Sequence, residues 1–147
     1  MTDDGLLATF FVADMWCGIQ VDRVQEVLLD QDLEPVPMAA AGVVGLLNLR
    51  GQVLAAVDLR RRMGLAVRAP DASAIHYIID LGDGLESLIV DRAGPVVTTA
   101  GQRQWPVPET TPAGIADMLV GAYQHPDGLL LVVSLNRVLP SSSQQVR

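Results

Sequence analysis

The chain has 147 residues, half of them hydrophobic and only 4% aromatic, so an aliphatic core can fill one domain or two small units that share it. The formal net charge is −7, and an acidic chain of this kind is not expected to bind nucleic acid. All ten positive side chains are arginine, which excludes lysine chemistry, and the single cysteine, Cys17, excludes an internal disulfide or a multi-cysteine metal site.

Short strands dominate the predicted secondary structure. They are expected where apolar or alternating runs end at turn residues, and no stretch shows three turns of clean helical periodicity. The runs lie at 6–13, 16–21, 43–49, 52–58, 75–81, 85–90, 96–99, 118–123 and 129–134. The chain is therefore predicted to be mainly β.

Between these runs the expected structure is less regular. Residues 21–28 fit either a helical turn or a strand that begins after Arg23. Short helical turns are expected at 59–63 and 135–139, a linker at 68–73, and a long proline-containing connection at 102–114. Residues 141–147 read as a polar tail.

The stretch 43–60 is the most informative part of the chain. Two apolar runs flank Arg50 and Gly51, a pattern that predicts a hairpin with a tight turn. Asn48, Arg50, Asp58 and Arg60 are polar residues in this otherwise apolar stretch. They either support the fold, bind a partner or carry out chemistry.

The chain also repeats itself. Residues 21–27 resemble residues 90–96 at an offset of 69, and residues 44–61 resemble residues 120–137 at an offset of 76. This pattern predicts two similar β units, each too small for a comfortable core and stabilised by its neighbour. In the repeat, Asp58 and Arg60 align with Ser134 and Asn136, which favours a structural role for the pair.

Catalysis and metal binding are disfavoured. The two histidines, His76 and His125, have no neighbouring His or Cys, and no nucleophile motif is present. Asp22, Asp58 and Asp91 each end an apolar run and are followed closely by arginine, so a paired-aspartate enzyme is the alternative to simple capping or ion pairing. The basic run 60–62 is expected to be a solvated surface turn.

Two interpretations of Arg50-Gly51 remain open. The pair is either an ordinary exposed hairpin turn or a rigidly held arginine of the kind that anchors protein interfaces. Gly45 and Gly121 lie inside predicted strands, where glycine often marks the close approach of another backbone.

The stretch 42–60, followed by 63–65, resembles the signature of the CheW family of bacterial chemotaxis coupling proteins, roughly G-V-I-N-L-R-G-x-I-x-P-V-I-D-L-R and then F-G-L. Residues 17–27 resemble the family's Y-G-I-D-I and V-Q-E-I segments, and residues 88–92 resemble a later strand. The likeness runs from about 6 to 139. Segment 35–42 lacks the family's usual aromatic residue, and the segment 124–126 is also unusual for the family.

The resemblance implies a fold of two SH3-like five-stranded β-barrels packed side by side, within one domain at 6–140. The sub-barrels would cover about 6–66 and 70–140, with strands exchanged between them. It also implies a non-enzymatic adaptor without cofactor or metal. Such an adaptor would couple the cytoplasmic tip of a chemoreceptor to the regulatory domain of the histidine kinase CheA.

Through the resemblance, the implied receptor-binding residues are Val24, Glu26, Gly45, Arg50 and Gly121. The repeat adds Asn48 and Gly51 of the Arg50 turn, because Asn48 and Arg50 align with Gln124 and Pro126 and so have no matching residues in the second unit. The kinase is expected on an apolar barrel end. The acidic N-terminus and short apolar runs predict a cytoplasmic protein, which receptor arrays would recruit to the inner face of the membrane. The alternative within this class is a stand-alone regulator of a divergent kinase pathway.

Overall fold

The computed structural model describes residues 5–37 and 42–140, and within these ranges the chain is mainly β, as predicted. The strands are β1 (Leu6–Val12), β2 (Met15–Gln20), β3 (Val24–Leu28), β4 (Val43–Leu49), β5 (Gln52–Asp58), β6 (Ile75–Asp80), β7 (Leu85–Val90), β8 (Arg92–Thr98), β9 (Leu119–His125) and β10 (Gly128–Val133). The helices are η1 (Val21–Arg23), α1 (Leu59–Arg62), α2 (Ala113–Ala116) and α3 (Leu135–Val138). The polar tail, 141–147, lies outside the described residues.

Local sequence explains several element boundaries. Both interpretations of residues 21–28 hold, since one 3-10 turn leads directly into β3. The Asp58 carboxylate accepts the Arg60 N–H at 3.0 Å and caps α1, and Gly64, with φ of 76°, follows the end of that helix. Two features were missed, namely α2 and the early start of β8 at Arg92, because both lie in proline-containing segments.

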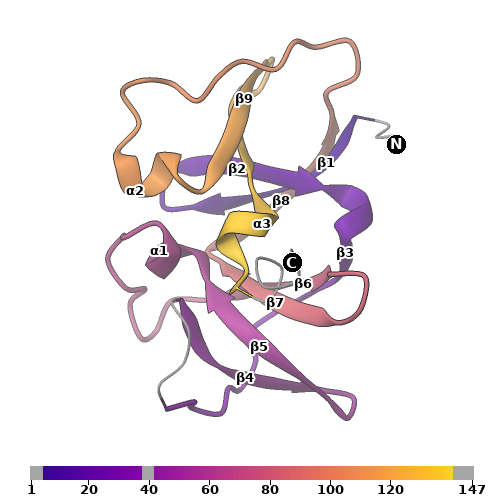
Figure 1. Ribbon diagram of the computed structural model, residues 1–147, viewed down its shortest axis with the longest axis vertical. Coiled ribbons are helices and arrows are strands. Elements are labelled where there is room, and N and C mark those ends of the chain that lie inside the picture. Colours follow the sequence, from indigo (N-terminus) through magenta and orange to yellow (C-terminus); the bar gives the residue numbers. More distant parts are fainter. Residues whose placement is uncertain (1–4, 38–41, 141–147) are drawn as a thin grey trace.

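The strands form two five-stranded sheets, which confirms the prediction of two five-stranded units. The first sheet has the order β8-β1-β2-β10-β9 and occupies the upper half of Figure 1, and the second has the order β3-β6-β7-β5-β4 and lies below it. Each sheet draws on both halves of the chain. Strand β3 leaves its hairpin neighbours β1 and β2 for the second sheet, whereas β8 pairs with β1 in the first.

The repeat seen in the sequence is present in the register of the strands. In the second sheet Gly45 pairs with Ala56, and 76 positions later Gly121 pairs with Val132 in the first sheet. Likewise, Val24 pairs with Ile79 in the second sheet, and Ala93 pairs with Phe10 in the first. Val24 corresponds to Ala93, and Phe10 to Ile79, at the offset of 69. The two sheets therefore share the same strand pairing, and each has a register shift beside its glycine pair.

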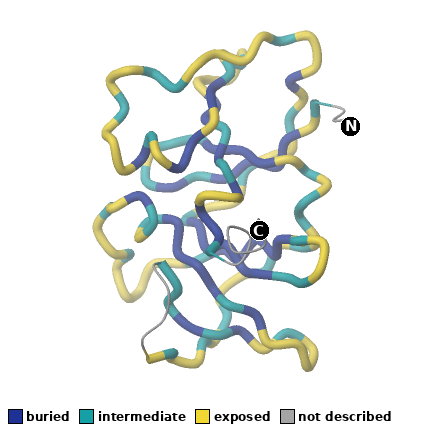
Figure 2. Tube along the Cα trace, in the orientation of Figure 1, coloured by how far each residue is buried: buried dark blue, intermediate teal, exposed yellow. Residues whose placement is uncertain are grey.

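The main core lies between the sheets. Phe10 of β1 and Tyr77 of β6 meet edge to face with ring centroids 5.2 Å apart, and the Tyr77 hydroxyl donates to the Thr9 carbonyl at 2.6 Å. Cys17 is buried in this core, as predicted, and burial raises the pKa of its thiol to about 12. Figure 2 shows the buried segments concentrated along the strands where the sheets face each other. A smaller cluster of Leu47, Leu54 and Ile78 fills the second sheet's own interior.

Candidate partner-binding surfaces

Arg50 and Gly51 form a two-residue loop closed by the Leu49–Gln52 pair. Their φ angles are 51° and 86°, the left-handed values that a type I′ hairpin turn requires at both positions. The side-chain oxygen of Asn48 accepts the Gly51 N–H at 3.1 Å. An arginine in the left-handed conformation is uncommon, because its Cβ lies close to the following carbonyl oxygen. The hairpin therefore keeps Arg50 in a backbone conformation that arginine rarely adopts.

The Arg50 guanidinium forms an ion pair with Glu26 of β3. The two residues come from opposite edges of the second sheet, since β3 and β4 are its outermost strands. The Arg50 side chain is 64% exposed and that of Glu26 is 27% exposed. The pair thus links the two edges and presents an oriented cation at the surface, which we call the Arg50 corner (Glu26, Asn48, Arg50 and Gly51).

Val24 lies two residues before Glu26 on β3, but it is only half-buried and packs against the core between the sheets. Its backbone begins the strand, and its pairing with Ile79 fixes the start of the register. A register shift separates Val24 from Glu26, which pairs with Ile78, so Val24 supports the core side of β3 and does not belong to the surface around Glu26.

Gly45 and Gly121 are buried beneath crossing backbone. A Cβ on Gly45 would lie 2.8 Å from the Glu34 carbonyl oxygen, and one on Gly121 would lie 2.8 Å from that of Trp105. The same two segments form single bridges to the strands, Glu34 to Leu46 and Trp105 to Ala122. These two glycines allow a covering segment to pair with β4 and β9, and they do not belong to an exposed surface of the Arg50 corner.

A second surface, which sequence reasoning did not locate, lies at the end of the first sheet. Its lining is mostly apolar and encloses a volume of about 560 Å³. We call it the apolar hollow, and its residues are Phe11, Met15, Trp16, Pro95, Leu129 and Leu131, together with Asp14, Asp127 and Gly128.

The apolar hollow and the Arg50 corner occupy corresponding ends of the two sheets. At an offset of 69, Glu26 matches Pro95, and at an offset of 76, Arg50 matches Pro126. One end is therefore closed by an ion pair, and the other end has two prolines in those places. The repeat could have indicated this surface, because the substitution of both charges by proline is visible in the sequence.

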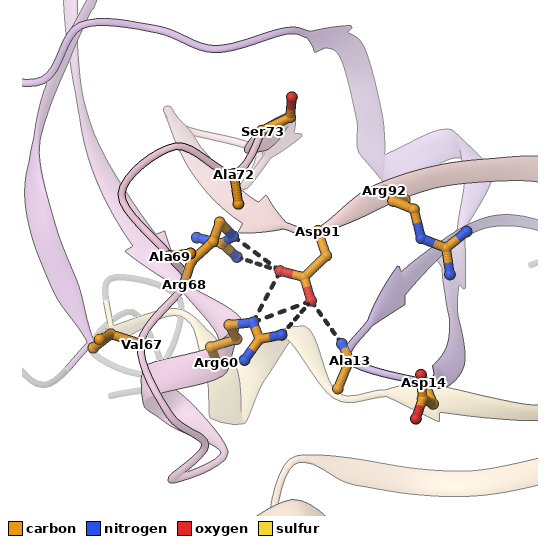
Figure 3. Close-up of a pocket in the computed structure, with 10 residues that line it drawn as sticks. All are labelled: Ala13, Asp14, Arg60, Val67, Arg68, Ala69, Ala72, Ser73, Asp91 and Arg92. Carbon is orange, nitrogen blue, oxygen red and sulfur yellow. Dashed lines mark hydrogen bonds and ion pairs between the residues drawn. The ribbon is translucent and has the colours of Figure 1, made fainter.

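Arg60, Arg68, Asp58 and Asp91 form an ionic cluster beside a second cavity. Figure 3 shows Arg60, Arg68 and Asp91 of this cluster at the cavity. Asp91 binds Arg60 and Arg68 at 3.0 and 2.8 Å and also accepts the Ala13 N–H at 2.6 Å. Burial opposes ionisation of Asp91, but these hydrogen bonds outweigh it and lower its pKa. The hydrogen bond to Asp91 in turn raises the pKa of Arg60.

This cluster corrects two expectations. The run 60–62 is not a solvated turn, because Arg60 enters the cluster and Arg62 donates to the carbonyls of Arg137 and Val138. Asp91 pairs with Arg60 and Arg68, not with the adjacent Arg92, which stacks on Phe11. Arg68 was overlooked because it belongs to the segment predicted as a linker.

The histidines lie apart. His76 is buried next to Ser87, with Nδ1 and Oγ 2.8 Å apart, and burial lowers the pKa of its imidazole. His125 ends β9 beside the apolar hollow. Within the described ranges, no three His, Cys, Asp or Glu side chains gather as a metal site would need. In the same ranges, no helix is long and apolar enough to cross a bilayer.

Comparisons with known proteins agree with this architecture. A family model described as a CheW-like domain matches residues 7–143. "Chemotaxis protein CheW" of Treponema pallidum is 24% identical and covers 95% of this chain and 84% of its own, and the protein of the same name from Rhizobium meliloti is 25% identical, covering 95% and 90%. The crystal structure of the scaffolding protein TtCheW from Thermoanaerobacter tengcongensis superposes with a TM-score of 0.76 over 90% of both chains, at 22% identity.

Proposed function

This chain belongs to the CheW-like family, and from that premise we propose that it is a non-enzymatic adaptor which couples chemoreceptors to the histidine kinase CheA. The support is the match over almost the whole chain and the names of its relatives, which are chemotaxis proteins. Two of the three carboxylates considered for an acid/base pair, Asp58 and Asp91, form ion pairs with Arg60 and Arg68.

The observation that carries the receptor side of the proposal is the Arg50 corner. Its guanidinium is exposed, yet the I′ turn and Glu26 fix its direction. A partner that docks there meets a preoriented cation and loses little side-chain entropy on binding. Arg50 and Glu26 would contact the receptor tip, Asn48 and Gly51 would shape the turn, and Val24 and Gly45 would support the strands beside it. Gly121, which lies on β9 of the other sheet, would instead allow the Trp105 segment to pair with that strand.

For the kinase side, the apolar hollow is the better candidate. It is the end of the other sheet, it is lined by large apolar side chains, and Leu129 within it is 47% exposed. Apolar area of this kind is what a stable interface buries at its centre. The two partners would then occupy corresponding ends of the repeat without overlapping.

In this role the protein would act in the cytoplasm, held at the inner face of the membrane by the receptor array. Co-sedimentation with receptor-containing membranes, with the CheA regulatory domain, and with both together tests the adaptor. Bridging requires that the chain increase recovery of the kinase with the membranes. If the chain binds each partner alone but never increases that recovery, it is a stand-alone regulator.

A further inference from the structure

Arg92 has no carboxylate partner, although it lines the same cavity as the ionic cluster. This cavity encloses about 670 Å³, and we call it the arginine cavity, because Arg60, Arg68 and Arg92 line it. Among the residues that the structure describes, no hydrogen bond or ion pair engages the exposed guanidinium of Arg92, and Figure 3 shows it apart from the cluster. Its central carbon instead lies 4.3 Å from the centroid of the Phe11 ring. The stack fixes the plane of the guanidinium and leaves the N–H groups at its edge available.

The repeat shows that this arrangement departs from the matching place in the second sheet. At the offset of 69, Arg92 and Phe11 match Arg23 and Asp80. There the Arg23 Nε–H donates to the Asp80 carbonyl at 2.9 Å, so that arginine is used within the fold. In the first sheet the matching carbonyl, that of Phe11, accepts the Asp91 N–H at 3.0 Å, and Arg92 lies over the ring. The fold therefore makes no polar use of Arg92.

The charges around the arginine cavity indicate which ligand Arg92 would take. In the ionic cluster two arginines balance two aspartates, so that the Asp91 carboxylate is already bound by Arg60 and Arg68. Asp14 also lines the cavity, and it is exposed and forms no ion pair with any described residue. One unpaired guanidinium favours a singly charged anion, and Asp14 disfavours further negative charge. A carboxylate meets both conditions and matches the paired N–H groups of arginine.

The arginine cavity adjoins the apolar hollow. Phe11, on which Arg92 stacks, lines the hollow, and Asp14 lines both. A protein segment that places apolar side chains in the hollow would therefore bring its neighbouring residues to the edge of the Arg92 guanidinium. Arginine and aromatic residues are the side chains that protein interfaces favour at their centres.

We propose that Arg92 is the binding residue of a carboxylate site, and that the carboxylate is an acidic side chain of the protein seated in the adjoining hollow. The carboxylate would accept N–H groups from the edge of Arg92 while Phe11 holds the guanidinium plane. A partner with a lysine at that place would be repelled, so Arg92 would select partners by charge. The identity of the partner as the CheA regulatory domain rests on the proposed function, whereas the site itself does not.

The site is tested first without a partner. Propionate, which has the end group of an acidic side chain, replaces chloride at constant ionic strength while the arginine Nε–H signals of the full chain are followed by NMR. We expect a saturable shift of the Arg92 signal, with a dissociation constant on the order of 10 mM. Arg92→Gln should abolish propionate binding, and Arg61→Gln, at an exposed arginine of α1, should leave it unchanged. A shift of Arg92 that never saturates, or that Arg61 shares, would overturn the carboxylate site.

The source of the carboxylate is tested with the CheA regulatory domain by calorimetry. Arg92→Gln should weaken binding roughly tenfold, Arg92→Lys should weaken it less because the charge is kept, and Arg61→Gln should not change it. If propionate binds at Arg92 but Arg92→Gln binds the kinase domain normally, the ligand is a small free acid and the protein source is wrong. If the wild type does not bind the kinase domain at all, the proposed kinase function fails, and the propionate titration alone decides the site.

Discussion

Arg50 of the β4–β5 turn and Glu26 of β3 form an ion pair between the two outermost strands of one sheet. Both residues are exposed enough that their attraction is weakened by water, so the pair contributes at most about 1 kcal/mol to stability. Its main consequence is orientation. The guanidinium has a defined direction at a surface where the backbone itself is held in a left-handed turn.

Arg50→Ala should therefore leave the fold intact and weaken receptor binding. Truncation of a rigid arginine at the centre of an interface typically weakens the binding free energy by about 2 kcal/mol or more, which is roughly a thirtyfold loss of affinity. Co-sedimentation with receptor-containing membranes measures the loss, and thermal unfolding measures stability. Arg61→Ala, at an exposed arginine of α1, is the matched control and should bind as the wild type does.

Arg50→Gly separates the side chain from the turn. Glycine adopts the φ of 51° without strain, so this variant should be at least as stable as Arg50→Ala and should lose the same receptor affinity. If Arg50→Ala unfolds the chain, or if Arg50→Gly binds normally, the corner is only a structural turn.

Gly45→Ala and Gly121→Ala should each destabilise the protein, because the new Cβ would lie 2.8 Å from a backbone carbonyl oxygen. Overpacking of this kind costs about 1–3 kcal/mol. Denaturant unfolding measures the free-energy change. Gly84→Ala is the control, since it has open space around the added Cβ and should change stability little. Equal stability of all three variants would mean that the covering segments at Glu34 and Trp105 can move away from the added Cβ at little cost in free energy.

Much of the fold could be predicted because its signals are local. Apolar runs bounded by Gly82 and by Asp127-Gly128 gave the hairpins, and the repeated spacing gave two similar units. The close backbone approach at Gly45 and Gly121 was also foreseeable, since a glycine inside a strand has few other uses.

Long-range pairing could not be predicted in the same way. Strand β3 has five residues, and nothing in them specifies β6 as a partner over β1 or β2, which lie nearer in the chain. The role of Arg68 could not be predicted for the same reason. It depends on ion pairs with Asp58 and Asp91, which lie near Arg68 only in the folded chain. The apolar hollow likewise combines residues from four strands and two turns.

Asp91→Asn should destabilise the protein by about 2 kcal/mol, because Arg60 and Arg68 would remain partly buried without their shared carboxylate. The pKa of Asp91 is lower in the folded protein than its ordinary value of 3.8, so folding favours the ionised form. Its contribution is fully present above about pH 4 and is lost as the pH falls through the folded-state pKa.

The stability difference between wild type and Asp91→Asn should consequently shrink below about pH 4, as measured by unfolding at a series of pH values. Asp22→Asn, at an exposed aspartate of η1, serves as the control and should change stability little at pH 7. A difference between wild type and Asp91→Asn that stays constant down to pH 2 would mean that the carboxylate charge is not what stabilises the cluster.

Leu129→Asp should weaken binding of the CheA regulatory domain while receptor binding stays normal. Leu129 is 47% exposed in the apolar hollow, so the charge is tolerated in the free protein but would be desolvated beneath a partner. A loss of about 1–3 kcal/mol, roughly fivefold to 150-fold in affinity, is expected by calorimetry. Val67→Asp places the same charge on an exposed valine away from the hollow and should bind the kinase domain normally.

If both variants bind the kinase domain as the wild type does, the kinase docks elsewhere. If Leu129→Asp instead loses the receptor, the two proposed surfaces must be exchanged.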